Sequence, residues 1–226
     1  AVPVPDSLSD EAAAQMVCNP LTVLMMRRAA QTHFAAGFDG VVLNNAAASA
    51  VGRLFTAGCE HHRFATISIV RNDDRAAQLR ERFPNVPVVS TSAADWQDEV
   101  RDAAAGRPIP VAFDPVGGTA TTDLLSLLSP GGTVYVYGEL ADTDITLRAS
   151  AILNAEKVIR GLSIGRWLTA VSPEQRASDL ASVLSLVRGL GAHLDTAAVY
   201  PIEQISDAVR AVTAPGKVGT VIVKTS

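Results

Sequence analysis

The chain has 226 residues, of which 48% are hydrophobic and 19% are charged, and its formal net charge is −4 at pH 7. This composition is typical of a globular protein and excludes a disordered chain. The acidic balance, the scattered arginines, and the lack of a signal-peptide pattern or an apolar run near the ~18 residues of a membrane helix favour a cytoplasmic protein that binds neither nucleic acid nor membranes.

The first 36 residues predict two helices. "VPDSLSDEAAAQM" places Ser7 or Ser9 at a capping-box spacing ahead of an alanine-rich helix, and "NPLTVLMMRRAAQTHF" predicts the second helix. We expect this segment to belong to a different layer or domain from the segments that follow it.

Strands and helices then alternate along the chain. The predicted strands, most of them continuously apolar and rich in Val and Ile, are 41–45, 65–71, 86–90, 110–116, 133–138 and 158–164. The predicted helices are 51–59, 74–83, 94–105, 121–128 and 173–190, the last with Ser172 as N-cap, Pro173 as first residue and Gly189 or Gly191 at its end. This alternation predicts an α/β fold of the Rossmann type, with a doubly wound parallel sheet.

The C-terminal residues depart from this alternation. They predict a strand at 194–200, a helix at 202–214 and a last strand at 218–224. We therefore predict three parts: an interdomain segment and helix at 1–20, a Rossmann domain at 21–168, and C-terminal helix and strands at 169–226.

Small residues mark the end of the first predicted strand, in "VVLNNAAASAVGRL". At the spacing of the dinucleotide-binding pattern G-x-G-x-x-G, this chain has Ala47, Ser49 and Gly52. Small side chains there let backbone N–H groups approach a pyrophosphate at the helix N-terminus. The same pattern also suits an alanine-rich helix start in an unrelated α/β protein.

The end of the second predicted strand, "ISIVRNDDR", carries positive charge. Proteins that bind NAD usually place Asp or Glu there for the ribose hydroxyls, whereas the 2′-phosphate of NADP needs donors such as those of Arg71 and Asn72. Asp73 and Asp74 are predicted to cap the next helix. A register error of two residues would favour NAD instead, and a surface arginine without a ligand is the other alternative.

With these residues in view, the sequence resembles the medium-chain dehydrogenase/reductase superfamily, and within it the quinone oxidoreductase and 2-enoyl thioester reductase branch. The resemblance rests on "VPDSLSDEAAAQMVCNPLTVLMM", "NNAAASAVGR", "IVRND", "FDPVGG", "GGTVYVYGEL", "KVIRGLSIGRWL" and "GKVGTVIVK", in this order. It implies an NADPH-dependent reductase that transfers hydride to the activated C=C of an enone, a quinone or a 2-enoyl thioester.

The resemblance also implies a set of NADP-binding residues. They are Asn19, Thr22, Ala48, Ser49, Ala50, Val51, Gly52, Arg71, Asn72, Val116, Gly117, Tyr137, Gly138, Ile164 and Lys217. Asn19 and Thr22 would lie near the nicotinamide half, and the residues from Ala48 to Gly52 would cradle the pyrophosphate. Arg71 and Asn72 would hold the 2′-phosphate. The turns after the fourth and fifth strands would line the cleft, Ile164 follows the sixth strand, and Lys217 would close the site from the C-terminal segment. Trp167 would either pack over the active-site cleft or be an ordinary half-buried tryptophan.

Family members carry a GroES-like domain ahead of the segment that begins this chain. That domain supplies much of the substrate pocket and, in the enoyl reductases, a catalytic tyrosine, so we assign no catalytic residue here. The chain begins at Ala1 without Met, which suggests a part of a larger polypeptide. We therefore expect cofactor binding with little turnover. Relatives commonly pair through the sixth strand, so "KVIRGLSIGRW" is a candidate homodimer edge.

Other function classes are less well supported. The histidines show no ligand spacing, His61 and His62 are expected to diverge, and Cys18 and Cys59 are expected to be buried free thiols, so we expect no metal. No G-x-S-x-G elbow of a hydrolase occurs. Two alternatives remain: a non-catalytic Rossmann association module, and an S-adenosylmethionine-dependent methyltransferase, against which Arg71 argues.

Overall fold

The structure, a computed structural model, describes residues 4–5, 8–34, 39–62, 64–214 and 216–225, which divide into two compact units. One, here called the sheet unit, comprises Met25–Ala48 and Phe55–Ser163. The other, the terminal unit, comprises Ala1–Leu24, Ser49–Leu54 and Ile164–Ser226. Each unit is described by itself. The three-part division at residues 20 and 168 stays a prediction.

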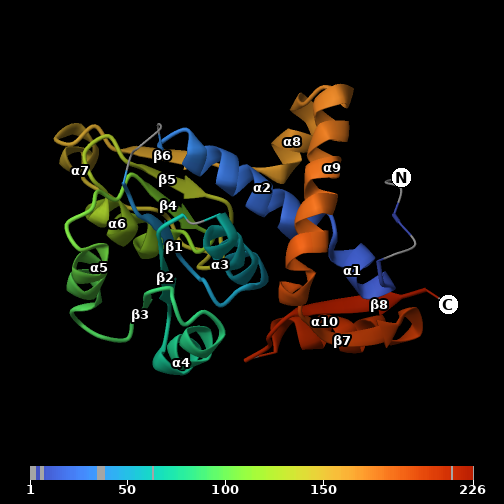
Figure 1. The fold of residues 1–226 in the computed structure, drawn as a ribbon. Helices are drawn as coiled ribbons and strands as arrows, with labels where there is room; N and C mark the ends of the chain where they lie inside the picture. Colours follow the sequence, from blue (N-terminus) through green and yellow to red (C-terminus); the bar gives the residue numbers. More distant parts are fainter. Residues whose placement is uncertain (1–3, 6–7, 35–38, 63, 215, 226) are drawn as a thin grey trace. The chain divides into compact units, whose positions relative to one another are not determined.

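The sheet unit is built on six parallel strands in the order β3-β2-β1-β4-β5-β6 (Figure 1). Their bounds are β1 Val42–Asn44, β2 Thr66–Val70, β3 Val88–Ser90, β4 Val111–Asp114, β5 Thr133–Val136 and β6 Val158–Gly161. Strands β1 to β4 are buried along their whole length, as their continuous apolar runs predict. The predicted α/β fold with a doubly wound parallel sheet is confirmed.

Six helices accompany this sheet along the chain. They are α2 Cys18–Gln31, α3 Ala50–His62, α4 Asp73–Arg82, α5 Trp96–Ala104, α6 Gly118–Leu127 and α7 Ala149–Leu153. The short helix α7 was not predicted, because none of its residues is buried and it shows no apolar stripe. Among the described helices, none combines the length and the apolarity that crossing a bilayer requires.

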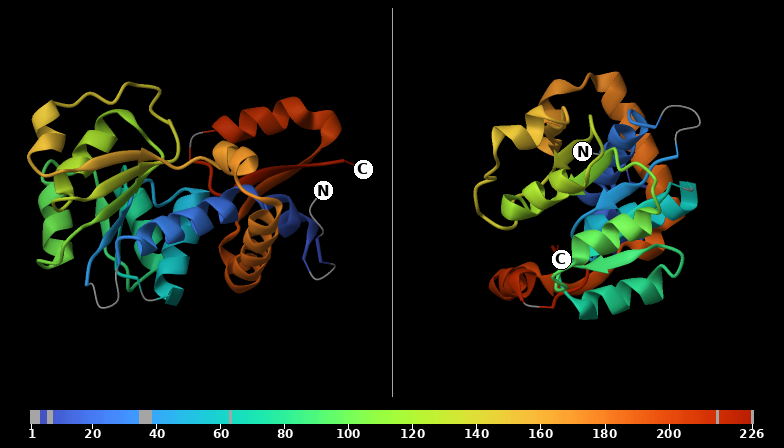
Figure 2. Two further views of the ribbon diagram at one scale, coloured as in Figure 1. Left: turned by 90° about the horizontal axis from the view of Figure 1, so that it is seen from above. Right: turned by 90° about the vertical axis from the view of Figure 1, so that its left-hand side faces the viewer.

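The two faces of the sheet carry different layers of side chains, since successive strand residues point to opposite sides. On one face, Leu43 and Val134 belong to a buried apolar cluster with Val100 of α5 and Leu124 of α6. On the opposite face, Phe113 of β4 packs edge to face on Phe55 of α3, with ring centroids 5.1 Å apart. Helices α5 and α6 thus cover one face and α3 covers the other (Figure 2).

The terminal unit holds the remaining elements. They are α1 Asp10–Gln15, α8 Ile164–Ala170, α9 Pro173–Leu190, β7 Thr196–Pro201, α10 Ile205–Thr213 and β8 Thr220–Lys224, with single 3-10 turns at Gly191–His193 and Ile202–Gln204. Strands β7 and β8 form a parallel two-stranded sheet. Lys224 of β8 lies 3.0 Å from the carboxylate of Glu11 in α1.

Helix starts in the terminal unit follow the predicted capping chemistry. The Ser9 side chain accepts a hydrogen bond from the amide of Ala12 at the start of α1, while Ser7 lies outside the described residues. At the start of α9, Ser172 is the N-cap and Pro173 the first residue. The predicted sixth strand was too long: it ends at Gly161, and Ile164 begins α8.

Candidate functional site

The turn after β1 bends through one residue in the left-handed region. Ala46 has a φ of 50°, a conformation that costs roughly 1–2 kcal/mol for a residue with a Cβ. Its amide donates to Oδ1 of Asn45, at 2.8 Å. The amide of Ala47 donates to the carbonyl of Ile69 in β2, at 3.0 Å, and its side chain is fully buried. Hydrogen bonds therefore hold the turn in a defined shape.

The next residues, Ser49–Leu54, begin α3 and belong to the terminal unit. The Ser49 hydroxyl accepts a hydrogen bond from the amide of Gly52, at 3.0 Å, so it caps the helix. Within the described residues, no acceptor is recorded for the amides of Ala50 and Val51. The start of α3 thus carries small side chains and main-chain donors, as the pyrophosphate prediction requires.

The end of β2 carries an exposed arginine. Arg71 follows five buried strand residues, and among the described residues the structure records no hydrogen bond or ion pair for it. Asn72 is the N-cap of α4 and accepts a hydrogen bond from the amide of Arg75, at 3.0 Å. The prediction that Asp73 or Asp74 caps this helix was therefore wrong; both lie in its first turn.

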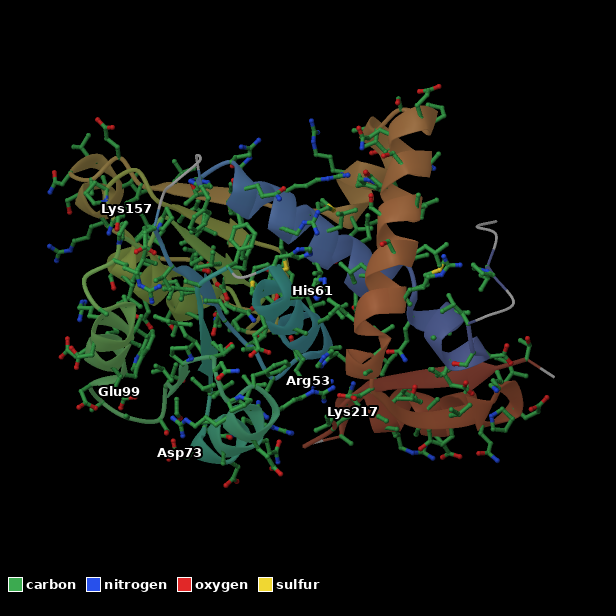
Figure 3. The ribbon with its side chains drawn as sticks, viewed as in Figure 1. Arg53, His61, Asp73, Glu99, Lys157 and Lys217 are labelled. Atoms are coloured by element: carbon green, nitrogen blue, oxygen red, sulfur yellow. The ribbon has the colours of Figure 1, made fainter. Side chains whose placement is uncertain are left out.

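Asp73, labelled in Figure 3, accepts a hydrogen bond from a serine that lies just beyond the end of β3. The Ser92 hydroxyl donates to its Oδ1 at 2.7 Å and also lies 2.7 Å from the Ser90 hydroxyl. Hydrogen bonds from Ser90 and Ser92 hold the pKa of Asp73 below its ordinary value. Arg71 therefore offers donors that no other described residue engages, beside a helix N-terminus whose nearby acid already has partners.

The turns after β4 and β5 are joined by backbone hydrogen bonds. The amide of Tyr137 donates to the carbonyl of Asp114 at 2.9 Å, and that of Ala141 donates to the carbonyl of Val116 at 2.9 Å. A Cβ added to Gly138 would lie 2.7 Å from the carbonyl oxygen of Pro115, so only glycine fits there without a shift. The four predicted cleft residues after these strands thus lie close together.

Glycine is also needed at the start of α6. Gly117 and Gly118 have φ angles of 80° and 55°, which strain residues with side chains. A Cβ on Gly118 would lie 2.2 Å from the Thr143 hydroxyl. The turn after β4 therefore needs residues without side chains at the carboxyl edge of the sheet, where open α/β sheets bind ligands.

Comparison with known proteins decides the family. The family model of the zinc-binding dehydrogenases matches residues 50–185. The chain belongs to the zinc-binding dehydrogenase family. With it, the chain belongs to the medium-chain dehydrogenase/reductase superfamily, which confirms the resemblance seen in the sequence.

Individual relatives of this chain are reductases by name. The mitochondrial enoyl-[acyl-carrier-protein] reductase of Mus musculus is 28% identical over 150 residues, which are 65% of this chain and 40% of that protein. An NADPH quinone oxidoreductase of Kluyveromyces marxianus is 28% identical over 160 residues, 65% of this chain and 41% of that protein. A crystal structure from Bacillus thuringiensis, assigned as an NADPH:quinone reductase, is 27% identical with a TM-score of 0.85 and covers 100% of this chain and 67% of its own. The chain thus spans about half the length of the curated relatives it matches.

Besides the residues at the start of α3, four of the predicted cofactor residues lie in the terminal unit. The Thr22 hydroxyl donates to the carbonyl of Cys18 at 3.0 Å, and Nζ of Lys217 donates to the carbonyl of Gly219 at 2.9 Å. Asn19 lies in α2, and Ile164 is the first residue of α8. Their roles toward a cofactor stay predictions.

The family name refers to zinc, but the described residues do not fit a zinc site. In that part of the chain, no group of three or more His, Cys, Asp and Glu could hold a metal ion. The rings of His61 and His62 do not diverge as predicted; their centroids are 4.9 Å apart. Cys18 is exposed, contrary to prediction, while burial raises the pKa of the Cys59 thiol.

Two residues that sequence reasoning missed organise the carboxyl edge of the sheet. Asn45 directly follows β1 and Asp114 is the last residue of β4, and their side chains are joined by a hydrogen bond of 2.8 Å. Both are polar residues at the carboxyl end of a largely apolar strand segment, which is the signal that could have identified them. Trp167, the predicted cleft aromatic, is buried and donates to Asp179 within the terminal unit.

Proposed function

We propose that this chain binds NADPH at the carboxyl edge of its sheet and that the protein is a reductase of an enone, a quinone or a 2-enoyl thioester. The observation that carries the proposal is the exposed and unengaged Arg71 directly after β2, where NAD-binding proteins place an acid. The 27% identical Bacillus thuringiensis structure and the Kluyveromyces marxianus enzyme, both NADPH proteins by name, support it.

Each part of the proposed site supplies one kind of contact. The small residues from Ala48 to Gly52 leave main-chain donors for the pyrophosphate at the start of α3. Arg71 and the free side-chain amide nitrogen of Asn72 hold the 2′-phosphate, because a guanidinium forms charge-assisted hydrogen bonds with phosphate oxygens. Backbone of the two joined turns, from Val116 to Gly117 and from Tyr137 to Gly138, lies against the nicotinamide half.

In the proposed reaction, bound NADPH supplies a hydride to the β-carbon of the electron-poor C=C, and a proton completes the reduction at the α-carbon. The share of this chain is orientation: the turns fix one face of the nicotinamide, and backbone near it limits access of water. No residue of this chain is assigned as the acid. We expect this chain to bind the cofactor.

Ligand titration tests the proposal. Fluorescence titrations with NADPH, NADH and S-adenosylmethionine should show tightest binding of NADPH. Arg71→Glu should weaken NADPH binding at least ~10-fold, because it replaces a phosphate-binding cation with an acid. The matched control is Arg101→Glu, which makes the same charge change on α5, where Arg101 is exposed and paired with Asp98.

Three results would overturn the proposal. Equal affinity of the wild-type chain for NADPH and NADH would show that the chain has no site for the 2′-phosphate. Tight binding of S-adenosylmethionine would favour a methyltransferase. Indifference to all three ligands would favour a non-catalytic association module.

A further inference from the structure

We infer that Asp114 is a positioning residue whose buried carboxylate holds the turn after β1 and the turn after β4 in the single arrangement that binds the dinucleotide. The inference rests on the proposed NADPH site. Asp114 is fully buried at the carboxyl end of β4, so its side chain acts through the groups around it and has no surface open to a ligand.

Four donors converge on this carboxylate. Its Oδ1 accepts from the amide of Val116 at 2.9 Å and from Nδ2 of Asn45 at 2.8 Å. Its Oδ2 accepts from the amide of Gly117 at 3.2 Å and from the hydroxyl of Thr121 at 2.5 Å. Both oxygens thus have two donors, which offsets the cost of burying the charge.

Two of these donors fix the turn after β4. Gly117 is the N-cap of α6 and has no side chain that could satisfy the helix amides. The Asp114 carboxylate instead fixes the residues directly before the helix, by accepting from the amides of Val116 and Gly117, and it also accepts from the hydroxyl of Thr121 near the start of α6. Its negative charge also lies at the N-terminus of this helix, where the helix dipole stabilises it.

A third donor connects Asp114 with the turn after β1. The side chain of Asn45 is hydrogen-bonded on both sides: its Nδ2 donates to Asp114, and its Oδ1 accepts from the amide of Ala46, at 2.8 Å. Ala46 is the left-handed residue of this turn. Strands β1 and β4 are neighbours in the sheet (Figure 1). For this reason one carboxylate at the end of β4 holds both turns.

The backbone of the same residue reaches a third strand end. The carbonyl of Asp114 accepts from the amide of Tyr137 after β5. One residue, 69 positions after its Asn45 partner, therefore holds the turn that precedes the proposed pyrophosphate residues and the turns that the proposed function assigns to the nicotinamide half. A site prepared in this way loses less free energy to ordering when it binds its ligand.

Removal of one hydroxyl tests the inference without removing the buried charge. Thr121→Val keeps the shape of the side chain and deletes one donor to Asp114. We expect it to weaken NADPH binding ~10-fold and to shift the NMR resonance of the Ala46 amide, in the other turn, without any ligand present. Asp114→Asn should do both more strongly, and Thr121→Ser, which keeps the hydroxyl, should restore wild-type values.

The matched control is Thr122→Val. Thr122 is the next residue of α6, and its hydroxyl donates to the carbonyl of Thr146, at 3.1 Å, away from Asp114. It should change neither NADPH affinity nor the Ala46 resonance. If Asp114→Asn fails to fold, Thr121→Val and Thr121→Ser still test whether Asp114 positions the two turns.

Failure of the inference and failure of the proposed function give different results. If wild type binds NADPH and Thr121→Val binds it equally well, or leaves the Ala46 resonance in place, the inference alone is overturned. If wild type binds no nicotinamide cofactor, the proposed function fails, and the inference fails with it.

Discussion

The indole Nε1 of Trp167 donates a hydrogen bond of 2.6 Å to Oδ2 of Asp179, and both side chains are buried. Oδ1 of the same carboxylate accepts from Nε2 of Gln175, at 2.7 Å. The guanidinium of Arg176 lies over the indole ring, 5.5 Å from its centroid. This cluster joins α8 to α9 within the terminal unit, so the indole nitrogen of Trp167 contributes to the packing of these two helices.

Trp167→Phe should destabilise the protein. The substitution keeps an aromatic ring but removes the donor to the buried Asp179, and a buried polar group that loses its partner costs about 1–3 kcal/mol of unfolding free energy. Urea unfolding followed by circular dichroism measures this cost. The control is Trp96→Phe, since no partner of the Trp96 indole nitrogen is recorded in the described chain. Equal losses for the two variants would contradict the role of the Asp179 bond.

Gly138→Ala should also destabilise the protein, and it should weaken NADPH binding. The added Cβ would lie 2.7 Å from the Pro115 carbonyl oxygen, a backbone atom that can move only by separating the turns after β4 and β5. Such crowding costs typically about 1–3 kcal/mol. Gly189→Ala in α9 is the control: apart from its own helix, the added Cβ would meet no atom of the described residues within 4 Å, and the variant should be neutral or stabilise by up to about 1 kcal/mol. Thermal unfolding and NADPH titration of both variants check this prediction.

Much of the fold could be predicted because parallel strands covered on both faces are continuous apolar runs. The ends of these strands were harder to predict. The predicted strand 158–164 ran into Ile164, because "VIRGLSI" stays largely apolar across the point where β6 ends and α8 begins. Hydrophobicity marks burial, and it does not show where pairing with the next strand stops.

The candidate site was predictable where chemistry is local. Small residues after β1 and a cation after β2 follow from position along the chain. Asn72, Asp73 and Asp74 are all good N-cap residues, and only the extended backbone of Asn72 selects it. The link from Asn45 to Asp114 depends on the pairing of β1 with β4, which no spacing in the sequence expresses.

The open edge of β6 should mediate a homodimer. The amides of Val158 and Leu162 donate toward β5, so the alternate residues Ile159 and Gly161 present their backbone to the open edge. Ile159→Pro removes an outward N–H and should convert a dimer to a monomer that keeps its fold. Light scattering after size exclusion measures the mass. Arg160→Pro, which removes an inward donor, should instead lower stability. A dimer that survives Ile159→Pro would exclude this edge.

Stability should fall as the pH decreases from about 7.5 to 5, because two histidines are held neutral in the fold. Burial lowers the pKa of His33. Burial, followed by the charges of Arg27 and His61, lowers the pKa of His62, whose Nε2 lies 2.8 Å from the Arg27 guanidinium. A histidine with a lowered pKa contributes stability that is complete above the ordinary value near 6.5 and is lost as the pH falls through the lower, folded-state value.

Two variants assign this pH dependence to the Arg27 pair. His62→Gln keeps an acceptor for Arg27 but cannot take up a proton, so the difference in unfolding free energy between pH 7.5 and pH 5 should become smaller than in wild type. Arg27→Met removes the neighbouring charge, lets the pKa of His62 return toward its ordinary value, and should also flatten the dependence. Urea unfolding at a series of pH values measures both effects. A wild-type protein that gains stability on acidification, or a His62→Gln variant with an unchanged dependence, would show that protonation of His62 does not oppose folding.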